Sequence, residues 1–339
     1  MSALQFVWFL LICILFVGFF FLEGFDFGVG MASGLIARTD SEKNTMLDII
    51  GPHWVVNETW LVTAGGAMFA SFPMWYASLF SGYYILFMLV LTGLILRGVS
   101  FEFANHAETS RGRHIWYNFF VFGSLLAPLM LCIIFFSMIQ GVPIDANGDA
   151  RLHFFDIINW LSLVGGIAGV LMSLIHGLNY TRLTTSGVLR DRARKLNRYL
   201  YPLLFVGEVV FALLVIFQTD FFTNKPVSSA IITLLIVLMS LLGAWGVYQD
   251  HEALSLVGSG LSLAFVVILI FNGLFPRVMI ATNPAHSILI KNASSSPTAL
   301  SIMTIVVCVL LPIVLIYFIW SYIIFAKRIP SSKKVAESR

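Results

Sequence analysis

The sequence predicts an all-α integral membrane protein, a polytopic bundle of about nine transmembrane helices. Of its 339 residues, 59% are hydrophobic and only 11% are charged, a balance that excludes a soluble globular protein. Long uncharged apolar runs recur along the chain, and the first, residues 6–22, reaches the length of a membrane span. The function of such a chain is therefore sought in the few polar residues that interrupt its apolar runs.

Nine segments are predicted to cross the membrane, within one transmembrane domain of residues 1–325 that is followed by a basic tail, 326–339. The segments are 4–30, 47–70, 75–100, 115–139, 157–181, 198–220, 227–248, 255–275 and 300–325. The first has no basic segment before it, so we interpret it as a retained span and not as a cleaved signal. Two four-helix units plus one extra helix would account for nine spans, although no sequence repeat proves this.

The basic residues predict the orientation. Lys and Arg are concentrated in the loop 182–198 and in the tail, and the positive-inside rule places both in the cytoplasm. Nine spans then put the N-terminus outside and the C-terminus in the cytoplasm. The loop 249–254 runs against this pattern, because it carries Asp250 and Glu252 but no Lys or Arg. The net charge of +3 requires no nucleic-acid partner, since the basic residues could also contact anionic lipid.

Two carboxylates end the first apolar run. Glu23, Asp26 and Gly30 share one face of the expected helix, which places Glu23 near the cytoplasmic boundary and Asp26 just beyond it. One interpretation is an interfacial cap that faces water. The other is a packed helix contact with a function, since small residues surround the pair.

Glu58 is predicted to lie near the middle of the membrane, roughly 15 Å along a helix that begins near residue 47. His53 and Asn57 form a stripe beside it. Intramembrane carboxylates are rare without a role, so we favour proton handling over a neutral, hydrogen-bonded packing residue. Glu208 lies about ten residues into its own span; the same argument applies less strongly, because nothing polar surrounds it in the sequence.

The histidines and cysteines predict no metal site. His53 and His176 have no partner at metal-ligand spacing, so both are interpreted as hydrogen-bonded packing residues and not as iron ligands. The three cysteines lie in apolar runs, without a Cys-x-x-Cys or Cys-x-x-Cys-His motif. Neither a disulfide framework nor covalent haem attachment is therefore expected.

Together these motifs resemble subunit II of the cytochrome bd-type quinol oxidases. The matching strings are EGFDFGVGM (23–31), GPHW (51–54), NETWLVTAGGA (57–67), ASLFSGY (77–83), LRGVSFEF (96–103), HG (176–177), FPR (275–277), NASSSP (292–297) and LPIVL (311–315) before Trp320. The resemblance covers nearly the whole chain. It implies a bacterial cell membrane protein that supports quinol oxidation coupled to the reduction of oxygen to water.

The resemblance also implies the partners and cofactors. Haem d and two b-type haems are expected in subunit I, and this chain is expected to carry neither haem nor catalytic residues. Membrane lipid and quinone are expected to bind the complex, and a small accessory subunit can accompany it. A structural quinone can be held in subunit II. The type of quinone is not implied.

One departure concerns proton delivery. Some members have an acid directly after the His-Trp pair, where this chain has Val55, and valine cannot transfer a proton. We expect Glu58 to take over, with Glu23 and Asp26 nearer the cytoplasmic mouth. Trp60 matches a tryptophan that lines the oxygen route in some members, and it could equally be a packing aromatic. Two other functions stay open: a proton-coupled secondary transporter and an assembly scaffold for the haem subunit.

Overall fold

The computed structural model describes residues 1–324 and 328–330, so most of the predicted tail lies outside the described residues. Within them, eight helices are long and apolar enough to cross a membrane. They are α1 (Ala3–Ile36), α5 (Tyr84–His106), α6 (Ser110–Gln140), α8 (Trp160–Thr184), α9 (Val188–Gln218), α11 (Pro226–Tyr248), α12 (Glu252–Leu274) and α14 (Pro297–Ile324). The protein is thus a multi-pass, all-α membrane protein, as the composition predicts.

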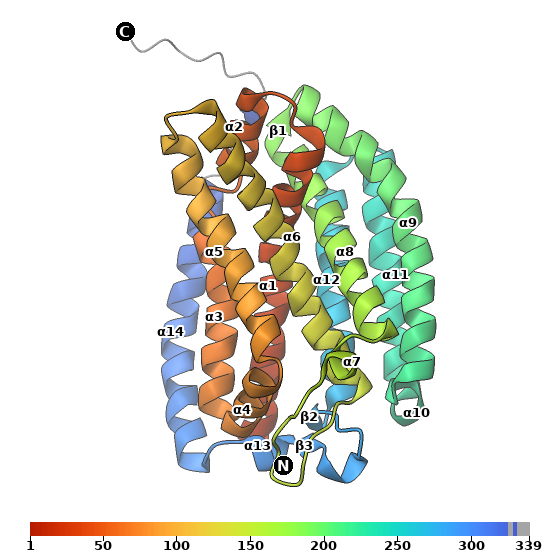
Figure 1. Cartoon of the computed structure of the whole chain (residues 1–339). Helices are drawn as coiled ribbons and strands as arrows, with labels where there is room; N and C mark the ends of the chain where they lie inside the picture. The colour runs from red at the N-terminus through yellow and green to blue at the C-terminus, as the bar shows by residue number, and fades with distance from the viewer. Residues whose placement is uncertain (325–327, 331–339) are drawn as a thin grey trace.

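The remaining predicted span, 47–70, corresponds to α3 (Trp54–Ser71), which lies alongside α1 and α14 in the same bundle (Figure 1). Polar residues, Asn57 and Glu58 among them, make it less apolar than the other eight. The predicted start at residue 47 is wrong. A short helix, α2 (Asp40–Asp48), ends there, and a turn at Gly51 and Pro52 separates it from α3, because the residue before a proline disfavours helical geometry.

The third predicted span also begins later than expected. Phe72 and Pro73 break the chain after α3, a helix of ten residues follows as α4 (Pro73–Gly82), and only then does α5 begin. Proline is well suited to the first turn of α4, where its missing N–H would have no helical partner. The remaining short helices lie in the connections: α7 (Phe154–Ile157), α10 (Phe221–Asn224), η1 (Pro284–His286) and α13 (Ile290–Ala293).

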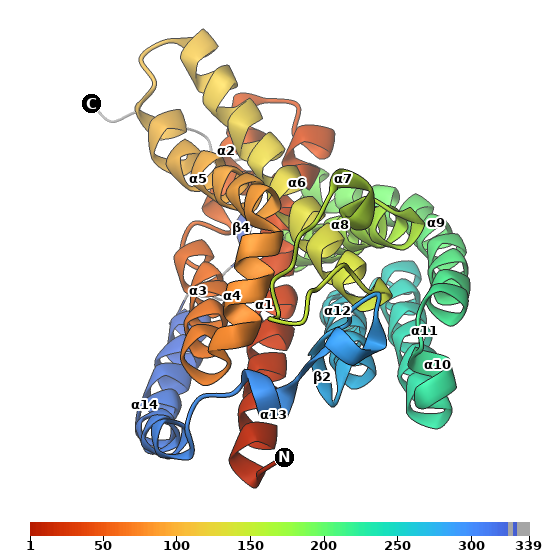
Figure 2. The same ribbon diagram turned by 60° about the horizontal axis from the view of Figure 1, so that its bottom comes forward.

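The spanning helices form two four-helix units with one extra helix, as the sequence count suggested. The first unit contains α1, α3, α5 and α6, and the second contains α8, α9, α11 and α12. The inner helices α1 and α8 pack against each other and both contact α6 and α12. Figure 2 shows the two groups on either side of this junction, with α14 added beside α3.

A close backbone approach sets the junction between the units. A Cβ atom on Gly28 of α1 would lie 1.9 Å from the Ser173 carbonyl oxygen of α8, a distance that no side chain could tolerate. Glycine therefore lets the two inner helices touch through their backbones.

Two small sheets mark opposite ends of the bundle. β2 (Arg277–Met279) pairs with β3 (Ile288–Leu289) at the end where the N-terminus lies, and β1 (Thr185–Ser186) pairs with β4 (Ile329–Pro330) at the other (Figure 1). The basic loop and the residues after α14 thus share one end, as the sequence predicts. That this end faces the cytoplasm remains a prediction.

The unexpected acids of the loop 249–254 are neutralised by the basic end of the bundle. Asp250 lies 2.8 Å from Arg190, 3.1 Å from Arg182 and 3.2 Å from Arg194. Glu252 pairs with Arg190 at 2.5 Å and also with Arg328. The loop therefore belongs with the arginines despite its own negative charge.

Candidate functional site

A buried charged cluster joins the first three spanning segments of unit one. Arg97 of α5, a residue with 0% exposure, ion-pairs with Glu23 of α1, and its Nη2 lies 3.9 Å from Oε1 of Glu58 on α3. The guanidinium also lies over the Phe27 ring, 4.8 Å from its centroid. A buried arginine is tolerated only with opposite charge beside it, and here two acids from two other helices supply that charge.

Asp26 extends the cluster towards α14. Asn57 Nδ2 donates a hydrogen bond to Asp26 Oδ2 at 2.8 Å, and Tyr322 Oη donates to Asn57 Oδ1 at 2.6 Å. The Tyr322 ring stacks on His53, with centroids 4.2 Å apart. The cluster thus draws on α1, α3, α5 and α14, four elements that are far apart in the sequence.

The structure brings the predicted acids together, but not at the predicted depths. Glu23 and Asp26 are both fully buried, so the interpretation of a water-facing cap is wrong for these positions. Helix α1 continues to Ile36, beyond the predicted end at residue 30, and so carries both acids inside the bundle. Glu58 lies only about 6 Å from the start of α3, near Arg97, and not deep beyond the other two acids.

Val55 and Trp60 lie on other parts of α3. The Val55 side chain is 57% exposed and points away from Asn57, which faces α1. The Trp60 ring packs on Gly18 of α1, where an added Cβ would lie 2.3 Å from the ring. Trp60 is thus a packing aromatic in this chain, and its role on an oxygen route stays a prediction.

His176 is a hydrogen-bonded packing residue, as predicted. Its Nδ1 lies 2.8 Å from Ser259 Oγ and its Nε2 lies 2.9 Å from the Phe21 carbonyl oxygen. Because both ring nitrogens have protein partners, His176 does not fit an axial haem ligand. His53 is buried and stacked on Tyr322. Among the described residues, no group of three or more His, Cys, Asp or Glu side chains could hold a metal ion.

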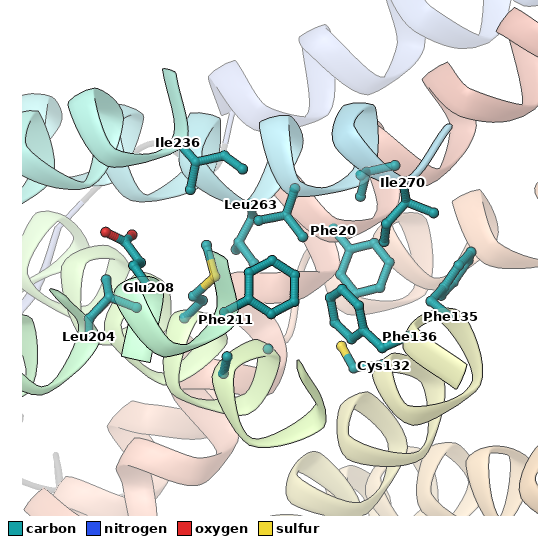
Figure 3. A pocket seen from close by; sticks show the side chains of 15 residues that line it. Phe20, Cys132, Phe135, Phe136, Leu204, Glu208, Phe211, Ile236, Leu263 and Ile270 are labelled. Atoms are coloured by element: carbon teal, nitrogen blue, oxygen red, sulfur yellow. The ribbon is translucent and has the colours of Figure 1, made fainter. Parts of the chain in front are cut away.

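Glu208 is not as isolated as its sequence neighbours suggested. Ser240 of α11 donates a hydrogen bond to Glu208 Oε1 at 2.5 Å, and Ser262 of α12 lies 2.9 Å from Ser240. Glu208 borders a cavity of about 50 Å³ between the two units. Figure 3 shows it at one end, with aromatic rings such as Phe20 and Phe136 at the other. This carboxyl is separate from the charged cluster of unit one.

Sequence reasoning missed two members of the cluster, Arg97 and Tyr322. Arg97 enters the sequence comparison only within the string LRGVSFEF (96–103) and was not singled out. Its position shortly after an uncharged run of α5 could have indicated a buried cation that needs acids nearby. Tyr322 gave no comparable signal, because a tyrosine near the end of a span is equally typical of an interface anchor.

Comparison with known proteins identifies the relatives of this chain. The model of the family "Cytochrome bd terminal oxidase subunit II" matches residues 4–325. Cytochrome bd ubiquinol oxidase subunit 2 of Bacillus subtilis is 41% identical over 330 residues, covering 97% of this chain and 98% of the relative. Cytochrome bd-I ubiquinol oxidase subunit 2 of Escherichia coli K12 is 33% identical, covering 95% and 94%.

The fold is also similar to that of a solved protein. A chain of the bd oxidase from Geobacillus thermodenitrificans superposes with a TM-score of 0.73, covering 95% of this chain and 99% of that one, at 15% sequence identity. At that identity the likeness concerns the fold alone.

Proposed function

Because the chain belongs to the cytochrome bd terminal oxidase subunit II family, we propose that it helps protons reach the site of oxygen reduction in a quinol:oxygen oxidoreductase. The haems would lie in the partner subunit I, where electrons pass from quinol to oxygen. We expect this chain to hold no haem iron, and His176, whose two ring nitrogens both have protein partners, does not fit as an iron ligand. Family membership favours this function over a secondary transporter.

The observation that carries the proposal is an imbalance of charge in the cluster. Glu23, Asp26 and Glu58 lie near a single arginine, Arg97. One guanidinium cannot neutralise three carboxylates in apolar surroundings. The cluster therefore holds at least one proton on a carboxyl group, and that group can pass its proton on and be reprotonated.

The geometry suggests the direction of transfer. Asp26 and its partner Asn57 connect to α14, whereas Glu58 lies on the α3 surface next to the exposed side of the helix, which includes Val55 and Val62. An exposed apolar surface on a membrane helix contacts lipid or a partner subunit. We assign this surface to subunit I, so a proton would leave the chain from Glu58.

The test uses the assembled oxidase. Glu58→Gln keeps the shape of the side chain but cannot release a proton, and we expect quinol-dependent oxygen consumption to fall roughly 10- to 100-fold with haem content unchanged. Glu208→Gln is the matched control, because Glu208 is also intramembrane but lies outside the cluster, and it should retain the wild-type rate. Wild-type turnover in Glu58→Gln would contradict the proposal.

A further inference from the structure

A second cavity reaches the charged cluster from the basic end of the bundle. It has a volume of about 500 Å³ and lies between α1, α8, α12 and α14. Leu22 and Phe25 form an apolar wall, and His53, Tyr180 and Tyr322 add polar groups. Exposed Arg328 marks its outer end. One water molecule needs roughly 10–15 Å³ of such space, so the cavity has room for a connected chain of waters.

The charges at the outer end do not favour an anionic ligand. The guanidinium of Arg328 is paired with Glu252, so it does not need another negative partner inside the cavity. The polar groups further in are the Tyr180 and Tyr322 hydroxyls and the His53 imidazole. The two hydroxyls donate to the Ile49 carbonyl and to Asn57, and each can still accept a hydrogen bond from water. Water suits this lining better than a lipid phosphate.

Tyr322 closes the inner end. Its hydroxyl donates to Asn57 at 2.6 Å, and Asn57 donates to Asp26 at 2.8 Å. A side-chain amide does not pass protons along in its ordinary form, so these two bonds are a seal and not a relay. The helix that carries Tyr322 packs little against the rest of this chain, since Leu300 and Ser321 are the buried residues of α14.

We propose that this cavity is filled with water and delivers protons to Asp26, with Tyr322 as the gate between the water and the carboxyl group. The inference rests on the proposed function. When the Tyr322 hydroxyl leaves Asn57, water can reach Asp26. The carboxylate then accepts a proton from a hydronium ion, which remains as water. The return of Tyr322 to Asn57 restores the seal.

The first test asks whether the cavity contains water, independently of turnover. In the assembled oxidase with the exposed Cys308 replaced by serine, Leu22→Cys should react with a charged methanethiosulfonate reagent added from the basic end. Ile14→Cys is the matched control on α1: its side chain is 56% exposed but faces hydrocarbon, so it should not react. An unreactive Leu22→Cys would overturn the inference whatever the oxidase activity.

The second test asks whether protons use the cavity. Attachment of the reagent to Leu22→Cys should slow oxygen consumption on the order of tenfold, less than the roughly hundredfold expected for complete loss of a proton-transfer group. Reduction with dithiothreitol should restore the rate, which no folding defect would allow. Leu183→Trp should block the same space, while Leu163→Trp, on the exposed side of α8, should not.

The outcomes separate the two proposals. If labelled Leu22→Cys keeps its full rate while Glu58→Gln is slow, the cluster carries protons but the cavity does not supply them, and the inference fails alone. If both keep the full rate, the proposed function fails as well. Tyr322→Phe keeps the ring on His53 but removes the hydroxyl that seals Asp26, so turnover should change while the labelling rate of Leu22→Cys, on the outer side of the seal, stays the same. Wild-type turnover in that variant would show that Tyr322 is not a gate.

Discussion

The two four-helix units use the same arrangement of inner helices with different charges. Helix α1 carries Glu23-Gly-Phe-Asp-Phe27, and α8 carries His176-Gly-Leu-Asn-Tyr180 at the corresponding place. Asp26 accepts a hydrogen bond from Asn57 on the next spanning helix at 2.8 Å, and Asn179 accepts one from Asn197 on α9 at the same distance. One geometry thus occurs with a carboxylate in unit one and with an amide in unit two.

The hydrogen bonds around Asn179 show how helices of this fold can be joined without a buried carboxylate. Asn179 also donates to Ser255 and Ser259, each at 3.0 Å, and Ser259 in turn contacts His176. This network joins three helices without a buried carboxylate, although a buried cation contacts it: Arg182 Nη1 lies 3.4 Å from Asn179 Oδ1 and 3.1 Å from Ser255 Oγ. Buried ion pairs usually stabilise a protein no more than such alternatives. The buried acids of unit one are therefore compatible with the proton delivery that we propose.

The largest expected effect comes from removing the cation of unit one. Arg97→Met would leave Glu23 and Glu58 without a counter-charge, and we expect about 3–5 kcal/mol of destabilisation. The measurement is the yield and melting temperature of the assembled complex. Arg192→Met is the matched control, because its pair with Glu42 is partly exposed and exposed pairs contribute about 1 kcal/mol or less. Equal melting temperatures for the two variants would show that Arg97 does not neutralise the cluster.

Exchanging the polar residues of the two inner helices should have unequal effects. Asp26→Asn can still accept from Asn57, so its melting temperature should stay near that of the wild type. Asn179→Asp loses the amide donor to the Ser255 carbonyl and the Tyr201 hydroxyl, at a cost of about 1–3 kcal/mol. The new carboxylate also meets Arg182, 3.4 Å from Asn179 Oδ1, and we expect that attraction to offset only part of the cost. If Asp26→Asn lowered the melting temperature and Asn179→Asp did not, the carboxylate of unit one would be the structural group, contrary to this prediction.

The loop acid Asp250 of unit two lies partly exposed at the basic end of the bundle and should respond to bulk pH. Hydrogen bonds from Arg190, with further ones from Arg182, hold the pKa of Asp250 below its ordinary value of 3.8. A lowered pKa in the folded state means that the stabilisation is present above about pH 4 and is lost as pH falls through the folded-state pKa.

Asp250→Asn provides the measurement. Asp250 has a φ of 64°, a conformation that asparagine also tolerates. The difference in melting temperature between wild type and variant should therefore be largest near neutral pH and should narrow below about pH 4. A difference that does not change with pH would mean that the Asp250 charge contributes nothing.

The smallest expected effect concerns Val55. It lies three residues before Glu58 and so within reach of it along the helix, but its side chain faces outward. In the Glu58→Gln background, Val55→Asp should raise turnover by a few-fold. This would recover part of the roughly 10- to 100-fold loss expected of Glu58→Gln. If turnover does not rise in the double variant, the proton route uses only the inner face of α3.

Composition and apolar runs were sufficient to predict the fold class, because a membrane span has a length and polarity that the sequence shows directly. The edges near Pro52 and Pro73 were less predictable, since local turn geometry decides where a helix restarts. Glu23, Asp26 and Glu58 could be singled out as intramembrane acids. Their common partner Arg97 could not be assigned, because the contact depends on how α1, α3 and α5 pack.

The second unit was harder to interpret for the same reason. Glu208 has no polar neighbour in the sequence, yet Ser240 reaches it from another helix. The correspondence between Glu23–Phe27 and His176–Tyr180 is also weak in the sequence, where only the glycine is shared. It becomes visible once Asn57 and Asn197 are seen to donate to equivalent positions.

Proton uptake by the Asp26→Asn oxidase, measured in vesicles after a single pulse of oxygen, tests the central claim most directly. Asp26→Asn gives unit one the amide that unit two has at Asn179, with the hydrogen bond from Asn57 retained. If the carboxylate serves proton delivery, uptake should slow by roughly tenfold or more in a complex with normal haem content and melting temperature. Uptake at the wild-type rate would show that the acids of unit one are structural, and would contradict the account.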